Sequence, residues 1–347
     1  MTTMANMTRV RRKGPSIEDV ARLAGVSAQT VSRVSTGSAS VRPTTRDRVL
    51  TAMNQLGYSP NRAARALRSG SFGSIGIITQ RLERTGEALT TAAVVRAAEA
   101  HDLSATLIHV EDPGSDGLEH AASRLTDQAV DGLVIVRVWH ASRESLVLPD
   151  GLPVAVSDSR LMGHHPSVDA DQVGGSAAAV EHLLSLGHRN IHHIAGPEGS
   201  QPALVRRATW QRCLQEAGLP TPRAWEGDWS GSSGYRIGQH LLTDESVTAV
   251  YCANDEMAFG LIRALHEGGR RVPEDVSVVG FDGIDLSEFS YPPLTTVRQD
   301  FRRIGEELVR LVMEQIQSRV VRAPTHVVLP TQLLIRGTTA PPPPDRV

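Results

Sequence analysis

Hydrophobic residues near the start of the chain recur at the spacing of short helices. The apolar positions of the first predicted helix are Ile17, Val20, Ala21 and Ala24. Ser16 and Asp19 stand three residues apart at its start, which is the spacing of a capping box. Gly25 suits a turn that leaves the right-handed helical region. We therefore expect a helix that begins near residue 17 and ends at a glycine turn.

Two further helices are predicted before residue 60. The second begins after Ser27. Its inward positions are Thr30, Val31 and Val34. The third runs from Thr44 or Thr45 to Leu56, and Gly57 ends it. Two short helices joined by a glycine turn predict a helix-turn-helix, whose second helix enters the major groove of DNA.

The second predicted helix has side chains that suit base recognition. Its outward positions are Ala28, Gln29, Ser32 and Arg33. A glutamine can bind adenine, an arginine can bind guanine, and a small methyl group can contact thymine. Together with Ser16, Ser27 and Thr30, these are the candidate DNA-contacting residues of the head.

After residue 71 the pattern changes to short apolar runs that alternate with helical stretches. The predicted strands are Ile75–Thr79, Ala105–Val110, Leu133–Val136, Val154–Ser157, Ile191–Ala195, Ala249–Ala253 and Val276–Phe281. The helical stretches include Thr91–Ala100, Val173–Leu186 and Asp255–Glu267. This alternation predicts parallel sheets with helical crossovers. Because the segment is too long for one sheet, we expect a small all-α head followed by an α/β body of two lobes with a cleft between them.

Charge is divided unevenly along the chain of 347 residues. Residues 1–70 contain twelve Arg or Lys and three acidic residues, a balance of +9. The other 277 residues contain 24 basic and 35 acidic residues, a balance of −11. A basic head on an acidic body indicates that the head binds a polyanion, although a basic, solvated tail would give the same count.

Several classes of protein are disfavoured. No apolar run approaches the roughly 18 residues of a membrane span, and no apolar stretch follows the basic N-terminus, so we expect neither a membrane segment nor a secretory signal. Walker, dinucleotide and nucleophile-elbow motifs are missing, so we expect no enzyme activity and no cofactor. His188, His192 and His193 are interpreted as structural rather than metal-binding, because adjacent strand residues point to opposite faces. The two cysteines, Cys213 and Cys252, fit buried thiols in a reducing cytoplasm.

Three polar residues follow apolar strands of the body. Asp158, Asn254 and Asp282 each come directly after a predicted strand. Carboxylates and amides at strand ends that face a cleft can form paired hydrogen bonds to the hydroxyl groups of a polyol. Any one of them could instead cap a following helix, but three together favour a ligand site.

The head resembles the LacI/GalR family of bacterial repressors. The stretches that carry the resemblance are Ser16–Ser35, Arg42–Arg46 and Leu56–Asn61. The resemblance implies that residues 61–67 form a hinge helix that folds on the operator beside its mate from a second subunit. Leu67 would then wedge into the minor groove, with Asn61 and Ala64 in contact with the DNA. The alternative is an alanine-rich linker with Leu67 packed on the body.

The resemblance also implies domain limits. We expect a disordered basic arm at 1–15, a helix-turn-helix domain at 16–60, a hinge and linker at 61–71, an effector-binding body at 72–338 and a proline-rich tail at 339–347. The body would be similar to a periplasmic sugar-binding protein, with an N-lobe of about 72–168 and 299–328 and a C-lobe of about 169–297 and 329–338. The chain would cross between the lobes three times.

In its C-terminal half the sequence is similar to one sugar-responsive member of that family. The matching stretches are Gly227–Ser230, Ala253–Ala258, Val278–Asp282 and Pro292–Phe301. By this resemblance the candidate effector-binding residues are Gln80, Asp158, Arg206, Trp229, Asn254, Asp282, Gln299 and Phe301. Three positions depart from that member: Gln80 replaces a small hydroxyl residue, Gly283 replaces a second acid, and Thr209 replaces a glycine. The tail lacks the apolar heptads of a coiled coil, so a homodimer is expected rather than a tetramer.

The expected function is a homodimeric transcriptional repressor of a sugar-utilisation operon. It would bind double-stranded operator DNA through two half-sites and release it when a galactoside-type sugar binds between the lobes. We expect it in the cytoplasm, associated with the nucleoid. One alternative is a family member that responds to another sugar or to a purine-type co-repressor. A remote alternative is a sugar-binding receptor without a DNA role.

Overall fold

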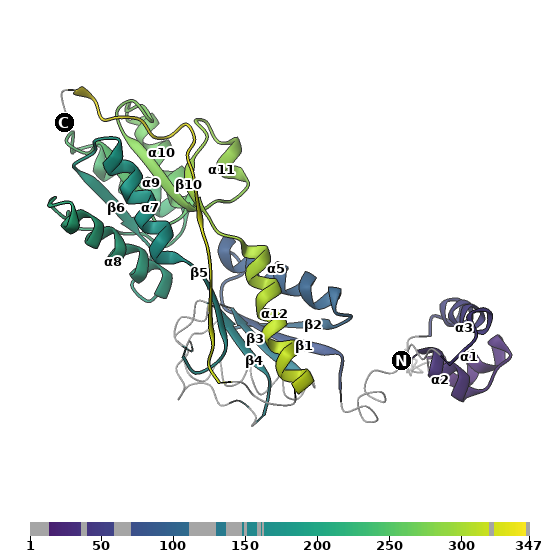
Figure 1. Ribbon diagram of the computed structural model, residues 1–347. Coiled ribbons are helices and arrows are strands. Elements are labelled where there is room, and N and C mark those ends of the chain that lie inside the picture. The colour runs from purple at the N-terminus through teal and green to yellow at the C-terminus, as the bar shows by residue number, and fades with distance from the viewer. Residues whose placement is uncertain are drawn as a thin grey trace, which may run out of the picture. The chain divides into compact units, whose positions relative to one another are not determined.

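The computed structural model describes residues 14–35, 40–58, 71–110, 130–136, 148, 151–157, 161, 163–318 and 323–344. The chain divides into two compact units, Met1–Phe72 and Gly73–Val347 (Figure 1). Each unit is described by itself below, as the head and the body.

The described residues of the head form three helices. They are α1 (Ile17–Ala24), α2 (Ala28–Ser35) and α3 (Pro43–Leu56). The predicted capping box is present: the Ser16 side chain accepts from the backbone N–H of Asp19, and the Asp19 carboxylate accepts from the N–H of Ser16 at 2.9 Å. Gly25 takes a left-handed conformation with φ 66° and closes α1. α3 begins a residue or two earlier than predicted, because proline is pre-organised for the first position of a helix.

A single apolar cluster holds these helices together. Its buried members are Val20, Ala21, Ala24, Val31, Val34, Val49, Ala52 and Met53. All three helices contribute to it, so the periodicity in the sequence corresponds to one shared core. The predicted helix-turn-helix is confirmed.

The described residues of the body form two six-stranded sheets. The first has the order β11-β5-β4-β3-β1-β2 and the second β12-β10-β9-β8-β6-β7. The first sheet comprises β1 (Ser74–Thr79), β2 (Ser104–His109), β3 (Gly132–Val136), β4 (Val154–Ser157), β5 (Ser167–Ala170) and β11 (His326–Leu329). The second comprises β6 (Ile191–Ala195), β7 (Trp225–Glu226), β8 (Ala249–Cys252), β9 (Ser277–Asp282), β10 (Thr295–Arg298) and β12 (Gln332–Leu334). The described pairs are parallel except β10 with β12, which confirms two lobes of mainly parallel α/β structure.

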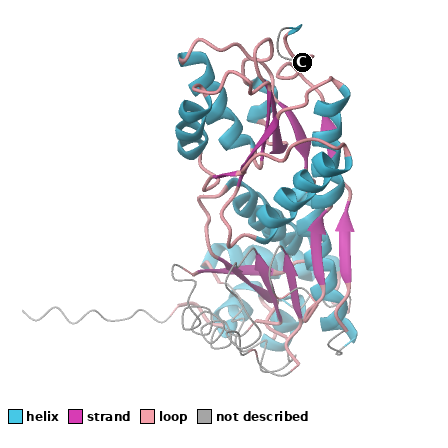
Figure 2. Cartoon of the chain, turned by 90° about the vertical axis from the view of Figure 1, so that its left-hand side faces the viewer, coloured by secondary structure: helices cyan, strands magenta, loops and turns pink. Residues whose placement is uncertain are grey.

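Helices pack on both sheets (Figure 2). Those of the N-lobe are α5 (Thr85–Ala100) and α12 (Phe301–Ser318). Those of the C-lobe are α7 (Gln172–Ser185), α8 (Gln201–Glu216), α9 (Gly231–Leu241), α10 (Asp255–Glu267) and α11 (Leu286–Phe289). α5 begins six residues before the predicted stretch, which had been limited to its alanine-rich part. The additional first turn matters because it lines the cleft.

The chain passes between the sheets in three places. It crosses between β5 and α7, between β10 and α12, and between β11 and β12. β5 stays paired with β11 as far as Ala170, so the expected limit at residue 168 falls inside a strand of the N-lobe. Segments of this kind, which join two lobes on either side of a cleft, are where hinge motions of two-lobed proteins are found.

Candidate effector pocket and DNA-reading helix

A pocket of about 360 Å³ lies between the two lobes of the body. The N-lobe contributes residues 83–87, which are the approach to α5 and its first turn. The C-lobe contributes Ser200, Pro202, Arg206, Trp229, Ser230, Gly231, Asn254, Glu256 and Asp282. The volume falls in the usual range for small-molecule sites, and four of the predicted effector residues line it.

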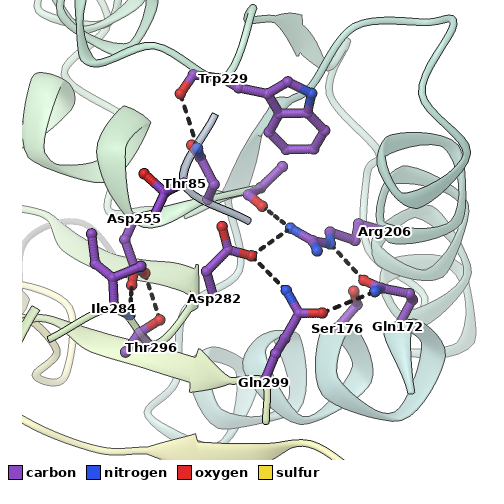
Figure 3. A network of polar contacts seen from close by, with 12 residues as sticks. Thr85, Gln172, Ser176, Arg206, Trp229, Asp255, Asp282, Ile284, Thr296 and Gln299 are labelled. Atoms are coloured by element: carbon purple, nitrogen blue, oxygen red, sulfur yellow. Dashed lines mark hydrogen bonds and ion pairs between the residues drawn. The ribbon is translucent and has the colours of Figure 1, made fainter. Parts of the chain in front are cut away.

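Arg206 is the centre of a buried polar network on the C-lobe wall (Figure 3). Its side chain is 2 % exposed, and its Nε donates to Gln172 Oε1 at 2.8 Å. Its Nη1 donates to the carbonyl oxygen of Ala253 and lies 3.5 Å from Asp282 Oδ1. The guanidinium also lies 3.7 Å from the centre of the Phe281 ring. The charge is therefore fixed in position by hydrogen bonds and by the aromatic ring beside it.

Two glutamines complete the network. Gln299 Nε2 donates to Asp282 Oδ1 at 2.7 Å, and Gln172 Nε2 donates to Gln299 Oε1 at 3.2 Å. With the contacts of Arg206, these bonds form a closed ring of four side chains. Gln172 was not predicted, although it holds both Arg206 and Gln299. A closed ring of satisfied polar groups resists displacement, because removing one member leaves buried partners unpaired.

Backbone strain is concentrated at this wall. Only three non-glycine residues in the described part of the chain have positive φ: Asp102, Trp229 at 71° and Asp282 at 108°. Two of the three line the pocket, which is the distribution expected of strained residues at functional sites.

Gly283 explains one departure from the family pattern. Its φ is 68°, and a Cβ atom there would lie 2.6 Å from the Cα of Arg298. With this backbone, the Cα atom of Arg298 in β10 leaves no room for a side chain at residue 283. An acid therefore cannot stand directly after Asp282 here.

Asn254 has a structural task as well as a place in the pocket. It caps α10, with its Oδ1 accepting from the N–H of Met257 at 3.0 Å. Its Nδ2 donates to the carbonyl oxygen of Trp229 at 2.9 Å and to Glu256 Oε2 at 2.7 Å. The other oxygen of Glu256 accepts from the hydroxyl of Thr85, which belongs to the N-lobe. Neither Glu256 nor Thr85 was predicted, because the role of each residue follows from a contact across the cleft that leaves no pattern in the sequence.

The remaining predicted effector residues lie elsewhere or are not described. Gln80 is buried after β1, and Phe301 is buried in the N-lobe core at the start of α12. Neither is among the described residues that line the pocket. Gln299 is not among the described residues that line the pocket, but it donates to Asp282, which is. Asp158 lies outside the described residues, as do Asn61, Ala64 and Leu67 of the expected hinge.

Two buried carboxylates flank the pocket. Glu87 lines it from the N-lobe and accepts from the N–H of Arg81 at 2.7 Å and from the hydroxyl of Thr79 at 3.4 Å. Asp255 lies behind it and accepts from the hydroxyl of Thr296 at 2.5 Å and from the N–H of Ile284 at 2.9 Å. Burial, aided by the nearby Asp282 charge, raises the pKa of Asp255 well above its ordinary value.

His188 and His193 of the body make structural contacts. His188 lies 3.0 Å from both Thr248 Oγ1 and Ser277 Oγ, and His193 Nδ1 donates to the carbonyl oxygen of Tyr251 at 2.8 Å. Within the described residues, no group of three or more His, Cys, Asp or Glu side chains could hold a metal ion. No helix in the same part of the chain is long and apolar enough to cross a membrane.

The DNA-reading candidates of the head lie on and beside α2. Val31 and Val34 are buried, whereas Gln29 and Arg33 are exposed and Ser32 is half-buried. Ser27 caps the helix by accepting from the N–H of Thr30 at 3.2 Å. The helix is therefore anchored by one face and presents Gln29 and Arg33 on the other. Ala28, which was predicted to point outward, is half-buried and packs against the apolar cluster of the head. Helix-turn-helix head and two-lobed body together define a ligand-responsive DNA-binding regulator.

Comparison with known proteins identifies the family. Residues 16–61 match the model for bacterial regulatory proteins of the lacI family, and residues 180–339 match the model for periplasmic binding protein-like domains. The chain is 35% identical to the lactose operon repressor of Escherichia coli (strain K12) over 336 residues, which cover 95% of this chain and 92% of that protein. The chain therefore belongs to the LacI family of transcriptional regulators.

Further relatives are named as repressors or regulators of other systems. The HTH-type transcriptional repressor PurR of Haemophilus influenzae (strain Rd) is 33% identical, covering 92% of this chain and 97% of that protein. The HTH-type transcriptional regulator CelR of Thermobifida fusca is 33% identical, covering 94% and 98%. A lac repressor dimer bound to operator and the anti-inducer ONPF superimposes with a TM-score of 0.83 at 35% identity, covering 94% of this chain and 100% of that one. These relatives are transcriptional regulators rather than enzymes.

Proposed function

We propose that this transcriptional repressor is a homodimer that binds a two-fold symmetric operator and releases it when a small sugar enters the pocket between the lobes. The observation that carries the effector part is the Arg206–Gln172–Gln299–Asp282 ring beneath Trp229. Such a wall offers paired donors and acceptors for vicinal hydroxyl groups and an aromatic face for the apolar side of a sugar ring. A galactoside is favoured, because the lactose operon repressor is among the relatives.

The DNA part rests on the head. α2 is held by its buried face, Gln29 is exposed in its first turn and Arg33 is exposed in its last turn. A dimer places two such helices on two half-sites, about one helical turn of DNA apart. The +9 charge of residues 1–70 supplies contacts to phosphate, so affinity should fall steeply with salt.

A purine-type effector is the second candidate, since PurR proteins are also relatives. The pocket itself argues for the sugar. Trp229 is the one aromatic residue among the described residues that line it, and four acidic side chains lie there with two arginines. A purine buries two flat faces and is best held between two apolar or aromatic surfaces, which this part of the wall does not offer.

Two measurements test the proposal. Selection from a pool of random duplexes should give a two-fold symmetric site for the dimer. Thermal shift against galactosides, glucosides, pentosides and purines should give a shift with a sugar that is lost in Asp282→Ala. The same sugar should release the selected duplex. A shift with a purine alone, or a sugar shift that Asp282→Ala leaves intact, would refute the sugar pocket.

A further inference from the structure

One hydrogen bond joins the two walls of the pocket at the Glu256 carboxylate. Glu256 is the second residue of α10 in the C-lobe, and Thr85 is the first residue of α5 in the N-lobe. Glu256 Oε1 accepts from the Thr85 hydroxyl, while Oε2 accepts from Asn254 Nδ2 at 2.7 Å. Both side chains line the pocket and both are half-buried. The bond therefore crosses the space that an effector would enter.

The side chain of Asn254 positions Glu256, and its hydrogen-bonding groups are not available to an effector. Its Nδ2 group donates to Trp229 and to Glu256, and its Oδ1 accepts from Met257. A side-chain amide has two donors and one acceptor oxygen, so each of these groups already has a protein partner. The Glu256 carboxylate is charged, so it is the stronger acceptor presented to a ligand at this place.

The hydroxyl of Thr85 is chemically equivalent to a sugar hydroxyl. Each donates one hydrogen bond to a carboxylate, and each gives a charge-assisted bond of similar strength. A sugar that stacks on Trp229 and binds Arg206 and Asp282 lies beside Glu256. Its hydroxyl then competes with Thr85 for the same acceptor oxygen.

We propose that Glu256 is a specificity-determining residue of the pocket and that the Thr85 hydroxyl is a built-in competitor, which a hydroxyl of the effector displaces. The inference rests on the proposed function, because it assumes a sugar effector. Only those protein molecules whose acceptor is free at a given moment can bind the ligand in full. The apparent affinity is therefore reduced in proportion to the fraction of molecules in which the acceptor is free. A ligand without a hydroxyl at that place is disfavoured, because it opens the Thr85 bond and offers Glu256 Oε1 no donor in its place.

The test is isothermal titration of the full-length dimer with lactose and with methyl β-galactoside. Thr85→Val keeps the shape of the side chain and removes the hydroxyl, so it should tighten binding about tenfold, the value of one charge-assisted hydrogen bond. Thr85→Ser keeps the hydroxyl and should bind as the wild type does. Glu256→Gln should weaken binding about tenfold. In the double variant the effect of Thr85→Val should be smaller, because a glutamine oxygen can still accept from the Thr85 hydroxyl but without the charge that strengthens the bond.

Glu99→Gln is the matched control for the charge change. Glu99 is exposed near the far end of α5 and is not among the pocket-lining residues, so this variant should bind as the wild type does.

Each other result contradicts the inference in a distinguishable way. Weaker binding by Thr85→Val would show that the bond holds the lobes together around the sugar. Unchanged binding would show that the bond takes no part in sugar binding. Either result would refute the proposal that the Thr85 hydroxyl competes with the effector. If Glu256→Gln binds the sugars as the wild type does, Glu256 is not a specificity-determining residue. If the wild type binds neither sugar, galactosides are not the effector and the inference falls with that clause of the proposed function. Thermal melting of each variant without sugar separates loss of folding from loss of binding.

Discussion

The DNA-reading helix and the effector pocket use polar side chains in opposite ways. On α2, the exposed Gln29 and Arg33 are placed by a helix that is itself fixed through Val31 and Val34. In the pocket, Arg206 and Asp282 are buried and hold one another through further side chains. A side chain placed by its backbone can be exchanged without harm to the fold, whereas a side chain that belongs to a buried network cannot. The head and the pocket should therefore respond differently to substitution.

Arg206→Met should produce the largest effect. It removes the charge that pairs with Asp282 and leaves that carboxylate buried, which costs about 3–5 kcal/mol of unfolding free energy. Sugar binding should be lost as well. Chemical denaturation of the full chain measures the first effect, and Arg33→Met is the matched control, expected within about 0.5 kcal/mol of the wild type. If both variants unfold at the same denaturant concentration, the contrast between head and pocket is wrong.

The second prediction concerns pH. Burial lowers the pKa of His193 from 6.5 to about 3, so the folded protein keeps this ring neutral. The unfolded chain binds a proton below about pH 6.5 and the folded chain does not until about pH 3. The free energy of unfolding should therefore fall as the pH is lowered through this window, by at most about 1.4 kcal/mol per pH unit from this group.

His193→Gln removes that titration. It should reduce the slope of stability against pH, measured by denaturation at a series of pH values. A smaller slope should remain, since burial also lowers the pKa of His188 and His192. An unchanged slope in His193→Gln would mean that the ring is not the group that resists protonation.

The same contrast explains what the sequence could predict. The capping box at Ser16, the glycine turn and the apolar stripe of α2 all lie within a few residues, so local pattern located the helix-turn-helix nearly to the residue. Seven strands were also found, four in the first sheet and three in the second. β5, β7, β10, β11 and β12 were missed, since each has only two to four residues and includes a polar one, so no periodicity shows.

The pocket was predicted only in part. Arg206, Trp229, Asn254 and Asp282 were found by resemblance and by their positions at strand ends. Gln172 and Glu256 were not, because their roles follow from contacts with residues 127 and 171 positions away in the chain. Phe301 was assigned to the effector by resemblance, yet its side chain packs in the N-lobe core. Long-range contacts of this kind leave no local pattern.

The third prediction addresses recognition by the head. Arg33→Ala should weaken binding to the selected duplex by about 1–3 kcal/mol and relax the base preference at one position of each half-site. Its thermal stability should stay near that of the wild type. Fluorescence anisotropy with the selected duplex and single-base variants measures both effects. A uniform loss on every sequence would assign Arg33 to phosphate contact instead.

The smallest effect is expected at Ser27, an exposed residue that caps α2. Ser27→Ala removes the cap on the N–H of Thr30 and should cost about 1 kcal/mol of stability in the head. Ser27→Asp keeps the cap and adds a negative charge at the helix start, so it should restore the stability of the head. It should also weaken DNA binding, because the new charge faces phosphate. If Ser27→Asp binds the duplex as the wild type does, α2 does not approach the DNA by its N-terminal end, and the assignment of the reading face would have to change.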